Sequence, residues 1–325
     1  MDTAFSAASP AKLYALHLKL RPVQQGTLMP FSGELVHAAF LRWIRATAPD
    51  VSEWLHDGSK RRLFTCSSLQ FPLPAARMRE AEARNTHMPL FSDKAYTIRL
   101  TLLLGELFPL LYNALLHVSD HAPLQHNQPF ITLGKQALLL QEAVMTDDSS
   151  GWTGFTTFDE LVQQVQASTL RPTEMFSLEF ASLTTAGWRN RLNKVYGDYY
   201  ALLPLPHYIF PMLAIRWNEL APSALAPLVQ LKRIEQYIQD DGMIISDYNL
   251  HPHAVAFTNH PQKGFIGTCQ YQLRGPDEPT TPETPLTVRQ QLLLLARFAF
   301  YSGVGYKTTM GLGQTRLVRG TSHEQ

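Results

Sequence analysis

The order of strand-like and helix-like segments predicts an α+β protein built from two tandem ferredoxin-like domains, with a glycine-rich loop near the C-terminus. In the first half, segments follow one another as strand, helix, strand, strand, helix, strand, which is the ferredoxin-like order. The same order recurs in the second half without obvious sequence identity. With 325 residues and 45% hydrophobic content, the chain is long enough for two separate cores.

The first half begins with clear signals for both kinds of element. Apolar residues alternate along Leu13 to Leu20, and Arg21-Pro22 ends this first strand. Apolar residues then recur at helical spacing from Leu35 to Ile44, and a shorter helical segment follows at 51–56. The other elements expected here are strands at 63–69 and 95–103, a helix at 106–118, and a strand pair at 130–133 and 138–143. We interpret residues 77–87 as a polar insertion.

The second half repeats the cycle after a polar stretch, Met145 to Thr173, which has the composition of a hinge or an interdomain crossing. We therefore expect an N-terminal domain at 1–150, a linker at 151–173 and a C-terminal domain at 174–325. The expected elements are strands at 175–183, 243–257, 264–273 and 315–318, and helices at 209–218, 224–237 and 288–301.

Charge and composition restrict the class of protein. The formal net charge is +1, so a contact with nucleic acid would need clustered basic residues rather than a strong overall field. The two cysteines, Cys66 and Cys269, lie far apart, which argues against a disulfide framework and fits a reducing compartment. Neither a secretory signal nor an uninterrupted apolar run of ~20 residues is present, so we expect a cytoplasmic protein with no membrane contact.

Histidine is the main candidate for chemistry, because H-E-x-x-H, G-x-S-x-G and G-K-[ST] are all absent. We expect neither a metal nor another cofactor. The cluster of His251, His253 and His260 could suggest a metal site, but it lacks a nearby acidic or thiol ligand. His56 opens a polar loop containing the three consecutive cations Lys60, Arg61 and Arg62, where a phosphodiester could be held and a proton moved. The alternative is an ordinary solvated basic loop.

His37 lies among apolar residues of the first predicted helix. It is a second candidate acid or base, and the alternative is a core histidine whose ring nitrogens have found partners.

The last distinctive stretch carries two G-x-G pairs, Gly303/Gly305 and Gly311/Gly313, around Lys307. Glycine allows sharp turns and close backbone approach, which suits a loop that contacts phosphates. The stretch connects a helix to a strand, the reverse of the strand-to-helix order of a P-loop or a Rossmann turn. Neither nucleotide-binding fingerprint therefore applies.

Three separated parts of the chain resemble one known family. They are the glycine-rich stretch from Ala296 to Arg316, an N-terminal block, and central segments. The N-terminal block comprises 35–41, 55–57 and 63–69, and the central segments comprise 216–218 and 264–267 with Tyr271. Together they resemble the CRISPR-associated endoribonucleases of the RAMP superfamily, which process precursor CRISPR RNA.

The resemblance implies tandem ferredoxin-like (RRM-like) domains and metal-independent cleavage of CRISPR repeat RNA. In this family the position of His56 typically holds the catalytic histidine, and that of His37 a second catalytic residue in some relatives. RNA supplies its own 2′-hydroxyl nucleophile, so we expect His56 and His37 as acid and base, with Lys60, Arg61 or Arg62 stabilising charge. The expected products carry a 2′,3′-cyclic phosphate and a 5′-hydroxyl.

Within the same resemblance, RNA-binding roles fall to Arg61 and to the loop residues Gly303, Gly305, Lys307, Gly311 and Gly313. The alternative function is a non-catalytic RAMP-type RNA-binding subunit of a CRISPR effector complex, since such subunits keep the glycine-rich loop. Other effector subunits are possible partners, and the chain is expected to be a monomer or a homodimer.

Overall fold

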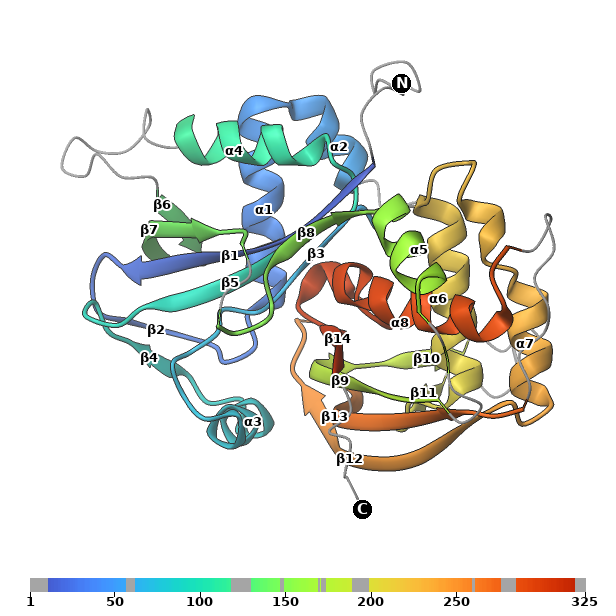
Figure 1. Cartoon of the computed structure of the whole chain (residues 1–325). Helices are drawn as coiled ribbons and strands as arrows, with labels where there is room; N and C mark the ends of the chain where they lie inside the picture. Colours follow the sequence, from blue (N-terminus) through green and yellow to red (C-terminus); the bar gives the residue numbers. More distant parts are fainter. Residues whose placement is uncertain are drawn as a thin grey trace. The chain divides into compact units, whose positions relative to one another are not determined.

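A computed structural model describes residues 11–56, 62–117, 130–146, 149–168, 170, 174–188, 199–258, 261–275 and 285–318 (Figure 1). The chain forms two compact units. Unit 1 comprises Met1–Thr157 with Val255–Pro261 and Thr308–Gly311, and unit 2 comprises Phe158–Ala254, Gln262–Lys307 and Leu312–Gln325. A short piece of the glycine-rich loop therefore belongs to the first unit, while the rest of that loop belongs to the second.

Unit 1 is built on an antiparallel sheet with the order β3-β5-β1-β7-β6, and β8 also pairs with β1. Four of these strands, β3, β5, β1 and β7, have the ferredoxin-like arrangement, in which the first and third strands of the cycle are central neighbours. The strands are β1 (Lys12–Pro22), β3 (Phe64–Cys66), β5 (Tyr96–Leu102), β6 (Phe130–Leu133), β7 (Gln136–Val144) and β8 (Gly154–Thr157).

Helices α1 (Gly33–Thr47) and α4 (Leu107–His117) complete the core of this unit. In α1, Val36, Phe40 and Ile44 recur every fourth residue and are fully buried. Phe40 packs on Phe64 of β3 with ring centroids 4.2 Å apart. Burial of one such side chain contributes roughly 1.5–3 kcal/mol, which explains why the periodic apolar pattern specifies α1.

Three smaller elements complete unit 1. Helix α2 (Pro49–His56) follows α1 after a single residue, and β2 (Gly26–Leu28) pairs with β4 (Met88–Leu90). Helix α3 (Ala75–Arg84) lies just before β4, so the segment expected to be a polar insertion is largely helical.

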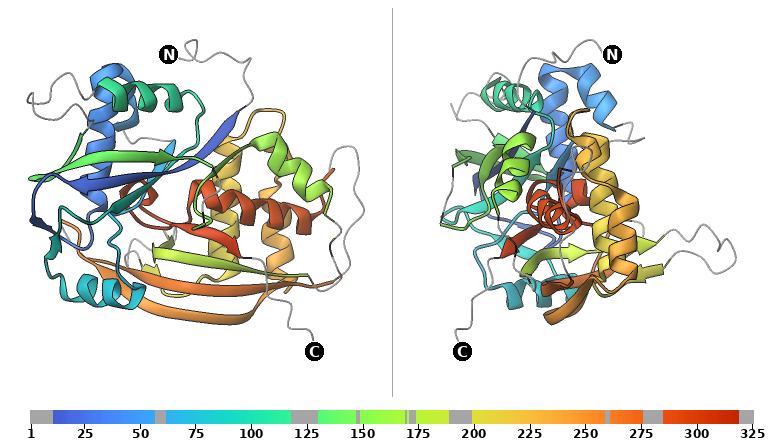
Figure 2. Two further views of the ribbon diagram at one scale, coloured as in Figure 1. Left: turned by 60° about the vertical axis from the view of Figure 1, so that its left-hand side comes forward. Right: turned by 45° about the vertical axis from the view of Figure 1, so that its right-hand side comes forward.

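Unit 2 has a sheet with the order β12-β13-β9-β14, which is the same ferredoxin-like arrangement. Helices pack on one face of this sheet (Figure 2). The elements are α5 (Phe158–Gln166), β9 (Met175–Thr184), β10 (Ala186–Trp188), β11 (Tyr199–Ala201), α6 (Pro206–Leu220), η2 (Ala226–Leu228), α7 (Leu231–Gln239), β12 (Met243–Val255), β13 (Gln262–Leu273), α8 (Val288–Ser302) and β14 (Thr315–Val318). The predicted fold class, two tandem ferredoxin-like domains of α+β type, is confirmed.

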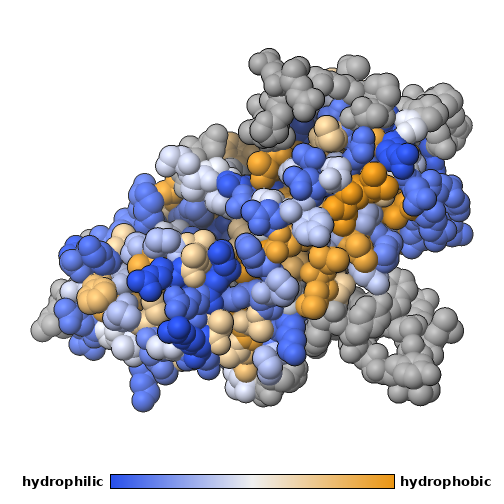
Figure 3. Space-filling view, turned by 90° about the horizontal axis from the view of Figure 1, so that it is seen from below, coloured by the Kyte–Doolittle hydropathy of each residue, from blue (hydrophilic) through white to orange (hydrophobic). Residues whose placement is uncertain are grey.

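Hydrophobic side chains gather in several patches among hydrophilic ones on the face seen in Figure 3. None of the helices in the described part of the chain is long and apolar enough to cross a membrane.

Candidate active site

His37 and His56 come from α1 and α2, and one hydrogen bond fixes the two helices against each other. Ser52 Oγ donates to the carbonyl of Leu41 over 2.9 Å. Residues four apart share a helix face, so His37 lies on the side of α1 that carries Leu41, and His56 on the side of α2 that carries Ser52. The structure therefore brings the two predicted catalytic histidines to adjoining helix faces.

The ring of His37 is held in one orientation by two contacts. Its Nδ1 lies 2.9 Å from the carbonyl oxygen of Thr309, and the ring stacks on Phe64 with centroids 5.5 Å apart. A carbonyl oxygen only accepts hydrogen bonds, so Nδ1 must carry the proton. In the neutral ring the lone pair is then on Nε2, which is the nitrogen able to accept a proton.

Burial lowers the pKa of the His37 imidazole below its ordinary value of 6.5. The hydrogen bond to Thr309 and the carboxylate of Glu34 oppose this shift, while the charge of His56 adds to it. Near neutral pH, His37 is therefore neutral and able to act as a base.

The segment that provides the Thr309 carbonyl is η3 (Thr308–Met310), and it is attached to unit 1 by several contacts. The thiol of Cys66 donates to the same Thr309 carbonyl over 2.9 Å, and Gly311 forms a parallel bridge with Ser67. Gly33, the first residue of α1, lies so close that an added Cβ would stand 2.0 Å from the Met310 carbonyl oxygen. Glycine at this position permits the close approach.

The start of α1 is tied to the chain just after β3. Ser32 Oγ accepts a hydrogen bond from the amide of Leu69 over 2.9 Å, and the Ser32 amide donates to Ser68 Oγ over 3.2 Å. These bonds position the helix that carries His37 against the strand that carries Cys66.

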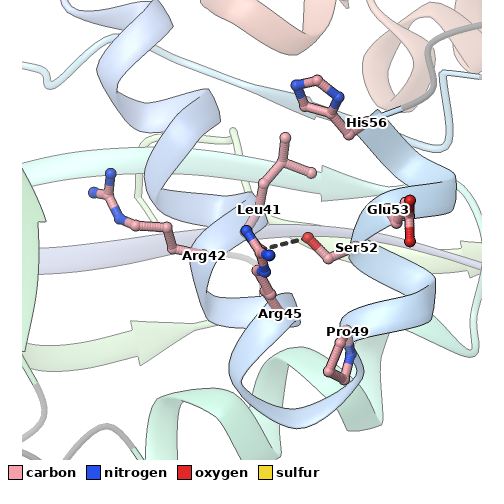
Figure 4. Close-up of a pocket in the computed structure, with 7 residues that line it drawn as sticks. All are labelled: Leu41, Arg42, Arg45, Pro49, Ser52, Glu53 and His56. Carbon is pink, nitrogen blue, oxygen red and sulfur yellow. Dashed lines mark hydrogen bonds between the residues drawn. The ribbon is translucent and has the colours of Figure 1, made fainter.

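A cavity of about 390 Å³ lies between α1 and α2 beside His56 (Figure 4). It is lined by Leu41, Arg42, Arg45, Pro49, Ser52, Glu53 and His56. Arg45 and Ser52 point toward one another in this view, and His56 stands at the end of α2. Both arginines are exposed, and Arg42 Nη2 also donates to the carbonyl of Thr132 over 2.6 Å. The Arg45 side chain therefore points toward α2, the helix that ends at His56, whereas the Arg42 guanidinium is directed to Thr132.

Sequence reasoning did not select Arg42 or Arg45. One signal could have found Arg45: it follows His37 by eight residues, a spacing that returns to the same helix face. Of the cations that were selected, Arg62 is half-buried just before β3, whereas Lys60 and Arg61 lie outside the described residues.

Most of the glycine-rich loop packs on unit 2. Gly303 and Gly313 donate their amide N–H groups to the carbonyls of Ala299 and Leu183 over 2.9 Å each. An added Cβ at Gly305, whose φ is +94°, would stand 2.5 Å from the carbonyl oxygen of Thr185. These glycines therefore allow close packing within unit 2, and the amides of Gly303 and Gly313 are already paired.

Lys307 is the cation of this loop. Its Nζ lies 5.7 Å from the ring centroid of the half-exposed Tyr306. Lys307 and Tyr306 thus present a charge and an aromatic ring together.

In the described part of the chain, no group of three or more histidine, cysteine, aspartate or glutamate side chains has the arrangement of a metal site.

Both halves of the chain match known protein families. Residues 13–163 match the CRISPR Cas6 N-terminal domain, and residues 178–315 match the CRISPR-associated endoribonuclease Cas6. The chain belongs to the Cas6 family. It is accordingly an endoribonuclease of CRISPR RNA processing, as the sequence resemblance predicted.

Solved Cas6 structures share its fold. A Cas6 from Thermus thermophilus has 21% identity and a TM-score of 0.60, with 96% of this chain and 100% of that chain covered. The product complex of the same Cas6 has 21% identity and a TM-score of 0.68 over 94% of this chain and 100% of that chain. A Cas6-related protein from Pyrococcus furiosus has 11% identity and a TM-score of 0.53 over 96% and 100%. None of the curated proteins matches the chain in sequence.

Proposed function

We propose that this chain cleaves CRISPR repeat RNA without a metal ion, by attack of the 2′-hydroxyl on the adjacent phosphate. The observation that carries the proposal is the pair of histidines on adjoining faces of α1 and α2, with His37 held in one tautomer by Thr309. RNA contains its own nucleophile, so the protein needs to supply only a base, an acid and positive charge.

In this mechanism His37 is the general base. Its Nε2 takes the proton of the 2′-hydroxyl, whose oxygen then forms a bond to phosphorus. The bond from phosphorus to the 5′-oxygen breaks, and His56 in its protonated form gives a proton to that oxygen. The products are a 2′,3′-cyclic phosphate and a 5′-hydroxyl. The lowered pKa of His37 suits the role of base, because the neutral ring predominates near neutral pH.

Arg45 is the proposed stabiliser of the negative charge that develops on the phosphate oxygens, with Arg42 as its neighbour. Both residues line the cavity beside His56, and the Arg45 side chain points toward α2. Guanidinium groups hold phosphate oxygens through paired donors. Lys60, Arg61 and Arg62 remain proposed contributors from the loop after His56. Lys307 is the proposed phosphate contact of the glycine-rich loop, with Tyr306 offering a ring to a base.

The test is cleavage of labelled cognate repeat RNA in EDTA under single-turnover conditions. We expect the unchanged protein to produce a 2′,3′-cyclic phosphate, and His37→Ala and His56→Ala to lose at least 100-fold in rate, the usual contribution of one acid or base. Repeat binding should stay close to that of the unchanged protein.

Two results would contradict the mechanism. One is cleavage of RNA that carries deoxyribose at the scissile nucleotide, because that substrate lacks the nucleophile. The other is tight repeat binding by the unchanged protein with no product in EDTA. If product were also absent when a divalent metal is added, the chain would instead be a non-catalytic RNA-binding subunit.

A further inference from the structure

Helix α3 is unusual for a helix of a folded unit because none of its residues is buried. A helix of this length normally depends on an apolar face packed against the protein. The sequence Ala-Ala-Arg-Met-Arg-Glu-Ala-Glu-Ala-Arg provides strong helix formers instead, and Asn85 ends the helix in the left-handed conformation. The helix is therefore only partly packed, and several of its residues line an open space in unit 1.

That space is a second cavity of about 580 Å³ in unit 1, apart from the one beside His56. Its volume is in the range of sites that hold small organic groups, roughly 300–1,000 Å³. Aromatic residues and cations both line it. They include Phe71, Arg77, Arg84, Phe91, Lys94 and Tyr96.

The aromatic side chains are held in fixed positions. Phe71 and Tyr96 meet edge to face with centroids 5.4 Å apart, and both are buried. The Tyr96 hydroxyl accepts a hydrogen bond from the Phe91 amide over 2.9 Å. Arg21 Nε donates to the carbonyl of Ser92, which anchors the same turn. Phe91 as a residue is nevertheless 44% exposed, so an anchored backbone presents a partly open aromatic side chain at the cavity.

The charged residues around the cavity are mostly positive. Arg77, Arg84 and Lys94 line it with one carboxylate, Glu80, and Lys94 also pairs with the exposed Asp93 at 3.9 Å. Glu80 pairs with Arg84 at 2.9 Å and with Arg77 at 3.7 Å, and both arginine side chains are more than two-thirds exposed. Exposed ion pairs of this kind contribute about 0–1 kcal/mol, so an incoming phosphate can readily take over these guanidinium groups.

We infer that the cavity under α3 binds an unpaired stretch of RNA, with a base against Phe91 and its phosphates on Arg84, Arg77 and Lys94. An exposed ring beside several cations is the combination that recognises single-stranded nucleic acid. A paired helix would not fit this chemistry, because its bases already stack on each other. The inference rests on the proposed function in one respect, that the chain acts on RNA.

The experiment measures binding of a short labelled RNA without base pairing to the full chain by fluorescence anisotropy. We expect Phe91→Ala to weaken binding about 5- to 150-fold, the loss expected for one stacked base. Phe91→Trp, which keeps an aromatic ring, should restore the affinity. Arg84→Gln should weaken binding and reduce its dependence on salt concentration, because one phosphate contact is lost. Tyr112→Ala removes another exposed ring of unit 1, outside the cavity, and should bind like the unchanged protein.

Equal affinity of Phe91→Ala and the unchanged protein would overturn the inference and leave a protein partner as the alternative occupant. Equal losses in Phe91→Ala and Phe91→Trp would also overturn it, because stacking would not explain them. The measurement is of binding, so absence of cleavage in the assay of the proposed function would not change its result.

Discussion

The contact between Gly33 and the Met310 carbonyl provides the sharpest test of the proposed site. Replacing Gly33 with alanine adds one methyl group at the first residue of α1. Helix propensity alone predicts a gain in stability of up to about 1 kcal/mol for this change. The structure predicts the opposite result, because the new Cβ would stand 2.0 Å from the Met310 oxygen and 2.9 Å from the Gly311 Cα.

The magnitude follows from this geometry. Carbon and oxygen atoms that are not bonded stay more than 3.0 Å apart, so η3 or the start of α1 must move by about 1 Å. Overpacking of this kind costs about 1–3 kcal/mol, which outweighs the gain in propensity. The same movement displaces the Thr309 carbonyl from His37 Nδ1 and releases the ring. Misplacement of a catalytic group by about 1 Å costs on the order of 100-fold in rate.

Single-turnover cleavage of repeat RNA and thermal denaturation measure the two effects separately. Gly105→Ala is the matched control, because its added Cβ would meet the nearest atom at 3.5 Å, an ordinary contact distance. We expect Gly33→Ala to melt at a lower temperature and cleave about 100-fold more slowly, with Gly105→Ala close to the unchanged protein. A Gly33→Ala variant that melts higher and cleaves at the normal rate would refute the role assigned to this contact.

Three further predictions concern the same unit. When the cleavage rate is plotted against pH, the rise on the acidic side should have its midpoint below pH 6.5, because burial lowers the pKa of His37 and the base must be neutral. A midpoint above 6.5 would contradict the role of His37 as the base. Arg45→Ala should slow cleavage at saturating RNA. A variant that binds the repeat more weakly but cleaves it at the normal rate when saturated would assign Arg45 to binding alone. Ser52→Ala should lower the free energy of unfolding by about 0.5–1.5 kcal/mol, measured in urea, because the hydrogen bond from the Ser52 hydroxyl to the Leu41 carbonyl between α2 and α1 is lost. An unchanged midpoint would contradict this role of the hydroxyl.

Some elements were predictable because their signal is local. The four-residue apolar repeat in α1 arises from burial of one face, and the alternation of residue types predicted β1, although residues on both faces of this central strand are buried. The structure confirms both elements. Helix α3 was missed as a helix because burial does not specify it, so apolar periodicity is absent. Its content of alanine, arginine and glutamate was a signal that helix propensity alone could have detected.

The sequence by itself determined the fold class, the family and the candidate histidines, because periodic apolar spacing and the glycine-rich stretch are written along the chain. Only the tertiary structure decided which groups surround them. Thr309 is 272 residues from His37, and no spacing rule connects a backbone carbonyl with an imidazole over that distance. In the sequence, Arg42 and Arg45 look like ordinary solvent-exposed helix positions. In the structure, α2 packs against α1, and both residues line a cavity that includes His56. These contacts depend on packing between elements, which one-dimensional patterns do not encode.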